Sequence, residues 1–168
     1  LKNLCVIGNA RTFVSSQPAS LENNKVIAVG RYSYQKGFDR LILAWSKVCQ
    51  DIDDWKLHLV GDGEIRESLQ QQINELKLSK SVVLGKAETD MLSVYQSASI
   101  LAMSSHYEGL PMVLLEAQAV GLPIVSFACK CGPKDVVEDG VDGFLVEEGD
   151  VDALANRLLM LMKDEKLR

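Results

Sequence analysis

The sequence has no hydrophobic run near the roughly 18 residues that a membrane-spanning helix needs, and no secretory signal is visible in it. Basic residues are in deficit, because 18 Lys and Arg stand against 23 Asp and Glu, for a net charge of −5. This balance disfavours a general nucleic-acid-binding protein. It leaves room for a local basic site that binds a phosphorylated small molecule.

Cysteine and histidine are scarce, with four Cys and two His in 168 residues. Only Cys129 and Cys131 lie close in the sequence, and one intervening residue is fewer than zinc ligands usually have between them. We therefore expect no metal site. We expect unbridged, structural thiols in a reducing compartment, which indicates a cytoplasmic location.

Two common nucleotide-binding fingerprints are missing. Gly61-Asp62-Gly63 follows a predicted strand, but Arg66 stands where a dinucleotide-binding motif has its third glycine. No Gly-Lys-Ser/Thr of the Walker type occurs either. These absences disfavour a dehydrogenase or a P-loop enzyme, and we interpret Gly61–Gly63 as a tight turn.

Apolar runs of strand length alternate along the chain with segments of helical periodicity. We expect strands at 4–7, 25–29, 57–60, 81–84, 100–103, 123–127 and 143–146, and helices at 38–49, 65–76, 89–98, 111–119 and 151–162. The segment 129–142 is expected to be a loop with one helical turn near 133–137. Such alternation predicts an α/β fold, a Rossmann-like parallel sheet with helices on both faces. Ligands of these folds bind at the carboxyl ends of the strands.

The chain divides into two unequal parts. Residues 1–24 are expected to form an inter-domain strand and a linker, because 8–24 contains few large apolar side chains. Residues 25–168 are expected to form one domain. The chain starts at Leu1 and stops within a helical pattern, so we expect a fragment of a longer protein.

The most informative stretch is 104–121, SSHYEGLPMVLLEAQAVG. It predicts a strand end, a loop and a helix with Pro111 at its first position and Gly121 at its end. The free N–H groups and the positive dipole at such a helix start favour an anion. Glu108 lies in the loop and Glu116 lies five residues past Pro111, about 7.5 Å along a helix, so an anion there would have a carboxylate on either side.

Two cations, Arg31 and Lys36, share the loop that follows the strand at 25–29. Arg offers a planar fork of donors and Lys a compact charge, and both suit a diphosphate. Taken alone, the loop is also compatible with two solvated side chains. His106 is open to two interpretations, a ligand contact or, as we prefer, a packed side chain.

Glu108-Gly109-Leu110-Pro111, continued to Glu116-Ala117, resembles the Glu-x7-Glu signature of the retaining glycosyltransferases of group 1 (family 4). Val29-Gly30-Arg31, followed by Lys36-Gly37, resembles a second motif of that family, and the two occur in the matching order. The resemblance covers about 26–161. It implies the carboxyl-terminal, donor-binding half of a GT-B fold, with the acceptor domain absent from this chain.

The resemblance also implies roles for individual residues. Arg31 and Lys36, with Gly30, would hold the donor diphosphate together with the backbone of Gly109, Leu110, Pro111, Met112 and Val113. Glu116 would accept hydrogen bonds from ribose hydroxyls, and Gly85 would lie under the base. Glu108 would lie near the transferred sugar, as a nucleophile or, as we favour, a positioning group. No metal or other cofactor is implied.

The implied reaction transfers a hexosyl group from a nucleotide diphosphate sugar, UDP first among them, to an acceptor with retention of configuration. The acceptor is unknown, with lipid-linked and polysaccharide chains as candidates and membrane association only through the missing half. The isolated fragment is expected to be inactive. A sugar-nucleotide epimerase, a phosphorylase of similar architecture and a non-catalytic nucleotide-binding module remain open as alternatives.

Overall fold

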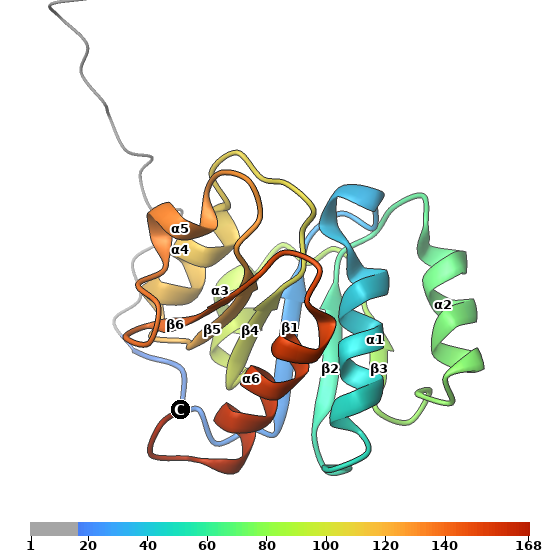
Figure 1. The fold of residues 1–168 in the computed structure, drawn as a ribbon, viewed down its shortest axis with the longest axis horizontal. Coiled ribbons are helices and arrows are strands. Elements are labelled where there is room, and N and C mark those ends of the chain that lie inside the picture. Colours follow the sequence, from blue (N-terminus) through green and yellow to red (C-terminus); the bar gives the residue numbers. More distant parts are fainter. Residues whose placement is uncertain (1–16) are drawn as a thin grey trace, which may run out of the picture.

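The structure, a computed structural model, describes residues 17–168. The strand predicted at 4–7 lies outside the described residues. Within 17–168, six parallel strands form one sheet in the order β3-β2-β1-β4-β5-β6. The predicted Rossmann-like α/β fold is confirmed (Figure 1).

Strands and helices alternate as the sequence predicts. The strands are β1 (Lys25–Val29), β2 (Lys56–Val60), β3 (Val82–Leu84), β4 (Ile100–Met103), β5 (Ile124–Phe127) and β6 (Gly143–Val146). The helices are α1 (Phe38–Val48), α2 (Arg66–Glu75), α3 (Met91–Gln96), α4 (Met112–Ala119), α5 (Pro133–Val136) and α6 (Val151–Lys163), and a short 3₁₀ turn, η1 (Tyr34–Lys36), precedes α1.

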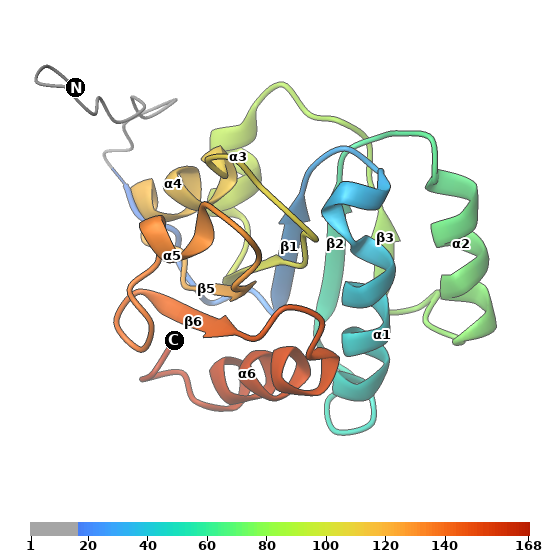
Figure 2. The same ribbon diagram turned by 45° about the horizontal axis from the view of Figure 1, so that its top comes forward.

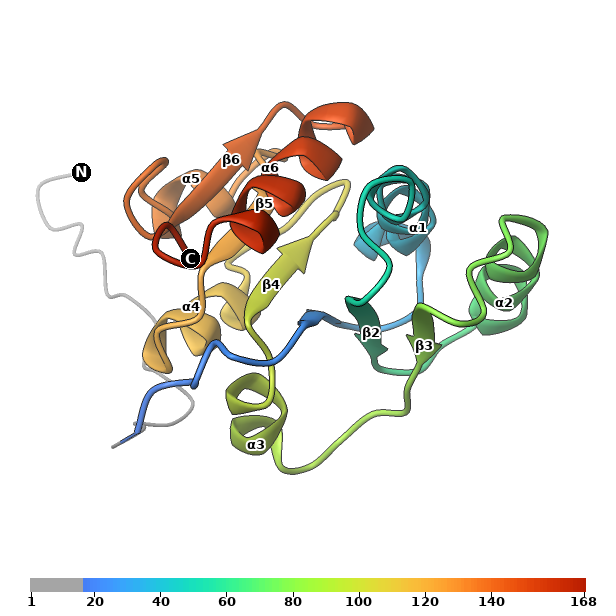
Figure 3. The same ribbon diagram turned by 90° about the horizontal axis from the view of Figure 1, so that it is seen from below.

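Helices cover the sheet on both faces. Figure 3 shows α1, α2 and α6 on one face and α3 and α4 on the other. Trp45, Leu59 and Leu158 belong to the core of the first face, and Leu101 and Leu114 to the core of the second. Strands β4 and β5 are buried along their whole length, which explains why β4 is a continuous apolar run and why β5 is apolar except for the buried Ser126.

Several helix ends differ from the prediction by one or two residues, and two of these differences are informative. Helix α4 begins at Met112, and Pro111 is its N-cap with extended backbone (φ −75°, ψ 92°). Helix α2 ends at Glu75, so that Leu76 is a C-cap residue that is 36% exposed and does not share the buried face of Leu69 and Ile73. Periodicity alone places helix ends poorly, because the terminal residues pack on one side only.

Asp150 caps α6 as predicted, since its carboxylate accepts a hydrogen bond from the Ala153 N–H at 2.8 Å. Asp90 caps α3 in the same way, through the Ser93 N–H at 3.1 Å. Each cap satisfies an N–H that the helix itself leaves without a partner.

The direction in which successive strands are added to the sheet reverses after β3. Strands β1, β2 and β3 step outward to one side, and the chain then returns so that β4 pairs with β1, with Val26 opposite Ile100. The loops after β1 and β4 therefore leave the same edge side by side (Figure 2). Ligands of open parallel sheets bind at this kind of switch point.

Candidate functional site

The loop after β1 and the loop after β4 are joined by hydrogen bonds. The Ser104 hydroxyl donates to the Lys36 carbonyl at 3.0 Å, and the His106 N–H donates to the Gln35 carbonyl at 2.8 Å. Gly37, at φ +59°, makes this approach possible, because a Cβ there would lie 2.3 Å from the Ser104 carbonyl oxygen. The two motifs, whose Lys36 and Glu108 are 72 residues apart in sequence, are thus held together.

The structure brings Lys36 into contact with Glu108. The Lys36 Nζ lies 2.6 Å from the Glu108 Oε1, and the two side chains are only 18% and 6% exposed. The Ser105 hydroxyl donates to the same carboxylate oxygen at 2.7 Å. The Lys36 stem passes close to Gly30, where an added Cβ would lie 3.0 Å from it. Lys36 therefore offsets the charge of the Glu108 carboxylate, and Lys36 and Ser105 together orient it.

Arg31 lies elsewhere on the same edge. Its Nε is 3.1 Å from the Glu64 Oε2, and both side chains are exposed, at 74% and 56%. Arg31 and Gly30 line a cavity of about 330 Å³ at the ends of β1 and β2, whose other walls include Asp62, Glu88 and Met91. The structure thus gives Lys36 and Arg31 different carboxylate partners.

The loop Gly109–Pro111 leads directly into α4. Gly132, at φ +90°, packs against it, since a Cβ there would lie 2.7 Å from the Gly109 carbonyl oxygen and 2.5 Å from Pro111. Leu110 is 39% exposed, and Met112 and Val113 form the first turn of the helix. First-turn N–H groups have no intrahelical acceptor and carry the positive end of the dipole. The helix start that the sequence predicts to bind an anion is therefore present, and the Lys36–Glu108 ion pair involves the loop that precedes it.

Glu116 contacts a residue that the sequence does not single out. The hydroxyl of Tyr95, on α3, donates to the Glu116 Oε2 at 2.6 Å. The Tyr95 side chain is completely buried. Burial, together with the hydrogen bond and charge of Glu116, raises the pKa of Tyr95, so the phenol stays protonated as a donor.

Gly85 uses its backbone groups inside the domain. Its N–H donates to the Leu59 carbonyl at 2.8 Å. Its own carbonyl accepts from the Tyr32 hydroxyl at 3.0 Å and from the Arg66 Nη1 at 2.6 Å, while the Arg66 Nη2 reaches the Leu84 carbonyl at 2.9 Å. Gly85 is thus fixed in place at the end of β3. Tyr32 and Arg66 fix it, and neither role has a local sequence signal.

His106 is packed, as the preferred interpretation has it. Its ring stacks on Tyr34, with centroids 4.2 Å apart, and its Nδ1 lies 3.8 Å from the Glu148 Oε1. The thiols of Cys49, Cys129 and Cys131 are unbridged, as predicted, and Cys5 lies outside the described residues. Burial and the charges of Glu108 and Glu148 raise the pKa of Cys129 to about 11, so this thiol is not a nucleophile near neutral pH.

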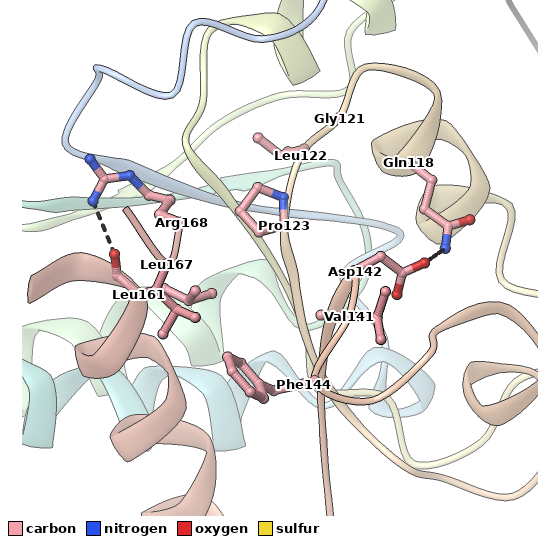
Figure 4. Close-up of a pocket in the computed structure, with 12 residues that line it drawn as sticks. Gln118, Gly121, Leu122, Pro123, Val141, Asp142, Phe144, Leu161, Leu167 and Arg168 are labelled. Atoms are coloured by element: carbon pink, nitrogen blue, oxygen red, sulfur yellow. Dashed lines mark hydrogen bonds between the residues drawn. The ribbon is translucent and has the colours of Figure 1, made fainter. Parts of the chain in front are cut away.

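A second, separate cavity of about 430 Å³ lies at the amino ends of β5 and β6. Figure 4 shows Phe144 and Leu161 on its wall, with Arg168 donating to the Leu161 carbonyl. None of the predicted site residues lines it. Among residues 17–168, no three His, Cys, Asp or Glu side chains are grouped to hold a metal ion, and none of the helices described there is long and apolar enough to span a bilayer.

Solved structures share this fold over most of its length. TarM of S. aureus matches with a TM-score of 0.87 at 25% identity, over 94% of this chain and 32% of TarM. Anabaena HepE, solved with UDP-glucose, matches with a TM-score of 0.79 at 29% identity, over 87% of this chain and 41% of HepE.

Curated relatives match in sequence. The amylovoran biosynthesis glycosyltransferase AmsD of Erwinia amylovora is 37% identical over 100% of this chain and 49% of the relative. An alpha-1,4-N-acetyl-D-galactosaminyltransferase of Campylobacter jejuni is 30% identical over 100% of this chain and 46% of its own length. The chain therefore spans about half the length of these relatives. The family described as "Glycosyl transferases group 1" matches residues 10–168, and the chain belongs to this family of glycosyltransferases.

Proposed function

We propose that this chain is the donor-binding half of an enzyme that transfers a hexosyl group from a nucleotide diphosphate sugar, UDP-sugar first among them. The observation that carries the proposal is the Lys36–Glu108 contact at the start of α4, where two motifs distant in sequence meet. Two structures of HepE hold UDP with glucose or UDP-glucose, which supports a UDP-sugar as the donor.

Lys36, Arg31 and the backbone of Gly109–Val113 bind the diphosphate in this proposal. The Lys36 ammonium group shares its hydrogen bonds between Glu108 and the phosphate oxygens. The first-turn N–H groups of α4 donate hydrogen bonds to the same phosphate oxygens. Charge on the diphosphate grows as the bond to the sugar breaks. Donors already fixed in place then bind more tightly in the transition state than in the ground state. This assignment needs no metal ion for leaving-group stabilisation.

Glu108 acts as a positioning group in this proposal. Its Oε1 accepts from both Lys36 and Ser105, and such neutralisation weakens a carboxylate as a nucleophile. It is well placed to orient Lys36 and to accept a hydrogen bond from a sugar hydroxyl. Configuration is proposed to be retained, which is consistent with the alpha linkages in the names of relatives.

In this proposal the nucleoside lies at the carboxyl ends of β1, β2 and β3. Glu116 accepts hydrogen bonds from the ribose hydroxyls, since one carboxylate can accept from two neighbouring hydroxyl groups. The cavity beside Gly30 and Arg31 extends to Ala87 and Glu88, two and three residues past Gly85. Because Gly85 is bonded within the domain, we assign the base to the segment that follows it.

Acceptor-binding groups are proposed to lie outside this chain, across a cleft that closes during turnover. Relatives are named for amylovoran biosynthesis and poly(glycerol-phosphate) glucosylation, which favours a polysaccharide or lipid-linked acceptor. A cytoplasmic location, at the membrane surface for the full-length enzyme, completes the proposal.

The proposal is tested by binding. A thermal-shift panel of UDP, GDP and ADP identifies the base, and calorimetry then compares the wild type with Lys36→Gln and Arg31→Ala. Each variant loses charge-assisted hydrogen bonds, so we expect affinity to fall about 10- to 100-fold for Lys36→Gln and less for the exposed Arg31.

Lys47→Gln is the matched control, because Lys47 pairs with Asp152 away from the site and its loss should leave affinity unchanged. Circular dichroism shows whether each variant is folded. Unchanged nucleoside diphosphate affinity in a folded Lys36→Gln protein would remove Lys36 from the site and overturn the proposal.

A further inference from the structure

We propose that Tyr95 is a positioning residue that holds the Glu116 carboxylate ready for the ribose hydroxyls of the donor. The inference rests on the proposed function, because it assumes that Glu116 receives the ribose. What it adds is a residue on a different helix, outside both sequence motifs, that sets the affinity of the site.

The contact joins two helices of the same face. Tyr95 lies on α3 and Glu116 lies on α4, and the phenol oxygen is 2.6 Å from the Glu116 Oε2. The Tyr95 ring belongs to the same buried cluster as Leu101 and Leu114, and Asp90 caps the helix that carries it. The donor is therefore fixed by packing from all sides, while the acceptor is a side chain with three rotatable bonds.

Fixing such a side chain before the ligand arrives strengthens binding. Ordering one long side chain costs about 0.5–1.5 kcal/mol on association, and a preformed geometry removes that cost. A carboxylate has about four lone-pair sites, and the bond from the phenol uses one of them. Because burial and Glu116 raise the pKa of Tyr95, the phenol donates at every physiological pH.

A simpler explanation is that a buried tyrosine hydroxyl needs some partner and Glu116 supplies it. The two explanations differ in what happens to ligands that lack ribose hydroxyls. If Tyr95 orients Glu116 for the ribose, its loss matters only when hydroxyls are there to be bound. If it only stabilises the packing of α3 on α4, its loss affects both kinds of ligand alike.

The experiment is calorimetry on Tyr95→Phe with UDP and with 2′,3′-dideoxy-UDP, or with the GDP pair if the panel selects guanine. Phenylalanine keeps the ring and its packing and removes only the hydroxyl. We expect UDP to bind about 3- to 10-fold more weakly, the range that follows from ordering one side chain. We expect the affinity for 2′,3′-dideoxy-UDP to stay within experimental error.

Two further variants sharpen the result. Tyr34→Phe removes an exposed hydroxyl at the same edge, since Tyr34 is 68% exposed, and should change neither affinity. Glu116→Ala should abolish the preference for UDP over its dideoxy analogue, and adding Tyr95→Phe to it should have no further effect, because the pair acts as a unit.

The outcomes separate this inference from the proposed function. A wild type that binds UDP but does not distinguish it from the dideoxy analogue removes Glu116 from the ribose site, and the role of Tyr95 with it. A wild type that distinguishes them, with Tyr95→Phe distinguishing them equally well, overturns the role of Tyr95 alone. Equal weakening of both ligands by Tyr95→Phe also overturns it, in favour of a packing role.

Discussion

The two cations at the site are held in different ways at the scale of single residues. Lys36 and Glu108 form a largely buried pair, supported by Ser105, whereas Arg31 and Glu64 meet in solvent. Exposed ion pairs contribute little to stability because water screens them. Glu64 therefore contributes little to the stability of the fold. It does compete with any bound anion for the Arg31 guanidinium.

We predict that Glu64→Gln tightens nucleoside diphosphate binding. The change frees Arg31 from its 3.1 Å contact and removes a negative charge near the proposed diphosphate site, so affinity should rise roughly two- to fivefold. Calorimetry at low salt measures the gain, which should shrink at high salt as charges are screened. Glu67→Gln is the control, because it removes the same charge from an exposed position three residues further along. An equal gain in both variants would show a general charge effect and not competition for Arg31.

Single residues of the site could be predicted only where a local pattern exists. The spacing of Glu108, Pro111 and Glu116 placed an anion site at a helix start, and the structure has that helix with Lys36 against Glu108. Tyr95 and Arg66 reach their partners across 21 and 18 residues, and which partners they reach depends on how α3 and α2 pack. The sequence predicted a base contact at Gly85, but it did not predict the hydrogen bonds that the backbone of Gly85 makes within the domain.

At the scale of elements, two helices end in the same motif with different residues. In α4 the N–H groups of Gly121 and Leu122 donate to the carbonyls of Gln118 and Ala117. In α2 the N–H groups of Lys77 and Leu78 donate to the carbonyls of Asn74 and Ile73. Both are Schellman ends, which need a left-handed residue after the C-cap. Gly121 adopts φ +69° without strain, and Lys77 adopts φ +58° with it.

We predict that Lys77→Gly raises the free energy of unfolding by about 0.5–1 kcal/mol, because glycine removes the steric cost of the left-handed backbone. Lys77 is exposed, so no buried contact is lost. Urea unfolding of the wild type and the variant measures the difference. Gly121→Ala is the reciprocal variant and should lose a similar amount, since there is room for its Cβ, with Pro18 at 3.8 Å. A less stable Lys77→Gly protein would contradict this account.

The sequence predicts which elements exist better than where they end. All six strands within 17–168 and the helices between them follow from apolar runs and helical periodicity. The start of α4 was placed one residue early and the end of α2 one residue late, at Pro111 and Leu76. These ends depend on capping geometry, which periodicity does not contain.

At the scale of the whole molecule, strand order decides which loops meet. Alternating strands and helices are compatible with several orders, and the pairing of β4 with β1 in the observed order places the loop of Lys36 against the loop of Glu108. The order depends on contacts between residues far apart in the chain, such as the pairing of Ile27 with Leu101. The resemblance to a known family supplied this information where residue patterns did not.

Stability of the whole molecule should depend on pH through His58, in the middle of β2. Burial, and then the charge of Lys25, lower the pKa of His58 below its ordinary value of 6.5. Between the lowered pKa and 6.5 the unfolded chain binds more protons than the folded one, so stability rises with pH across this window and falls on acidification. Carboxylates whose pKa is lowered in the folded state, such as Asp90, lose their contribution to stability only at lower pH.

We therefore predict a drop in melting temperature between about pH 7.5 and about pH 5.5, and His58→Gln should flatten this part of the profile. The same drop in His58→Gln, or a flat profile in the wild type, would show that the imidazole is as easily protonated in the folded sheet as in the unfolded chain.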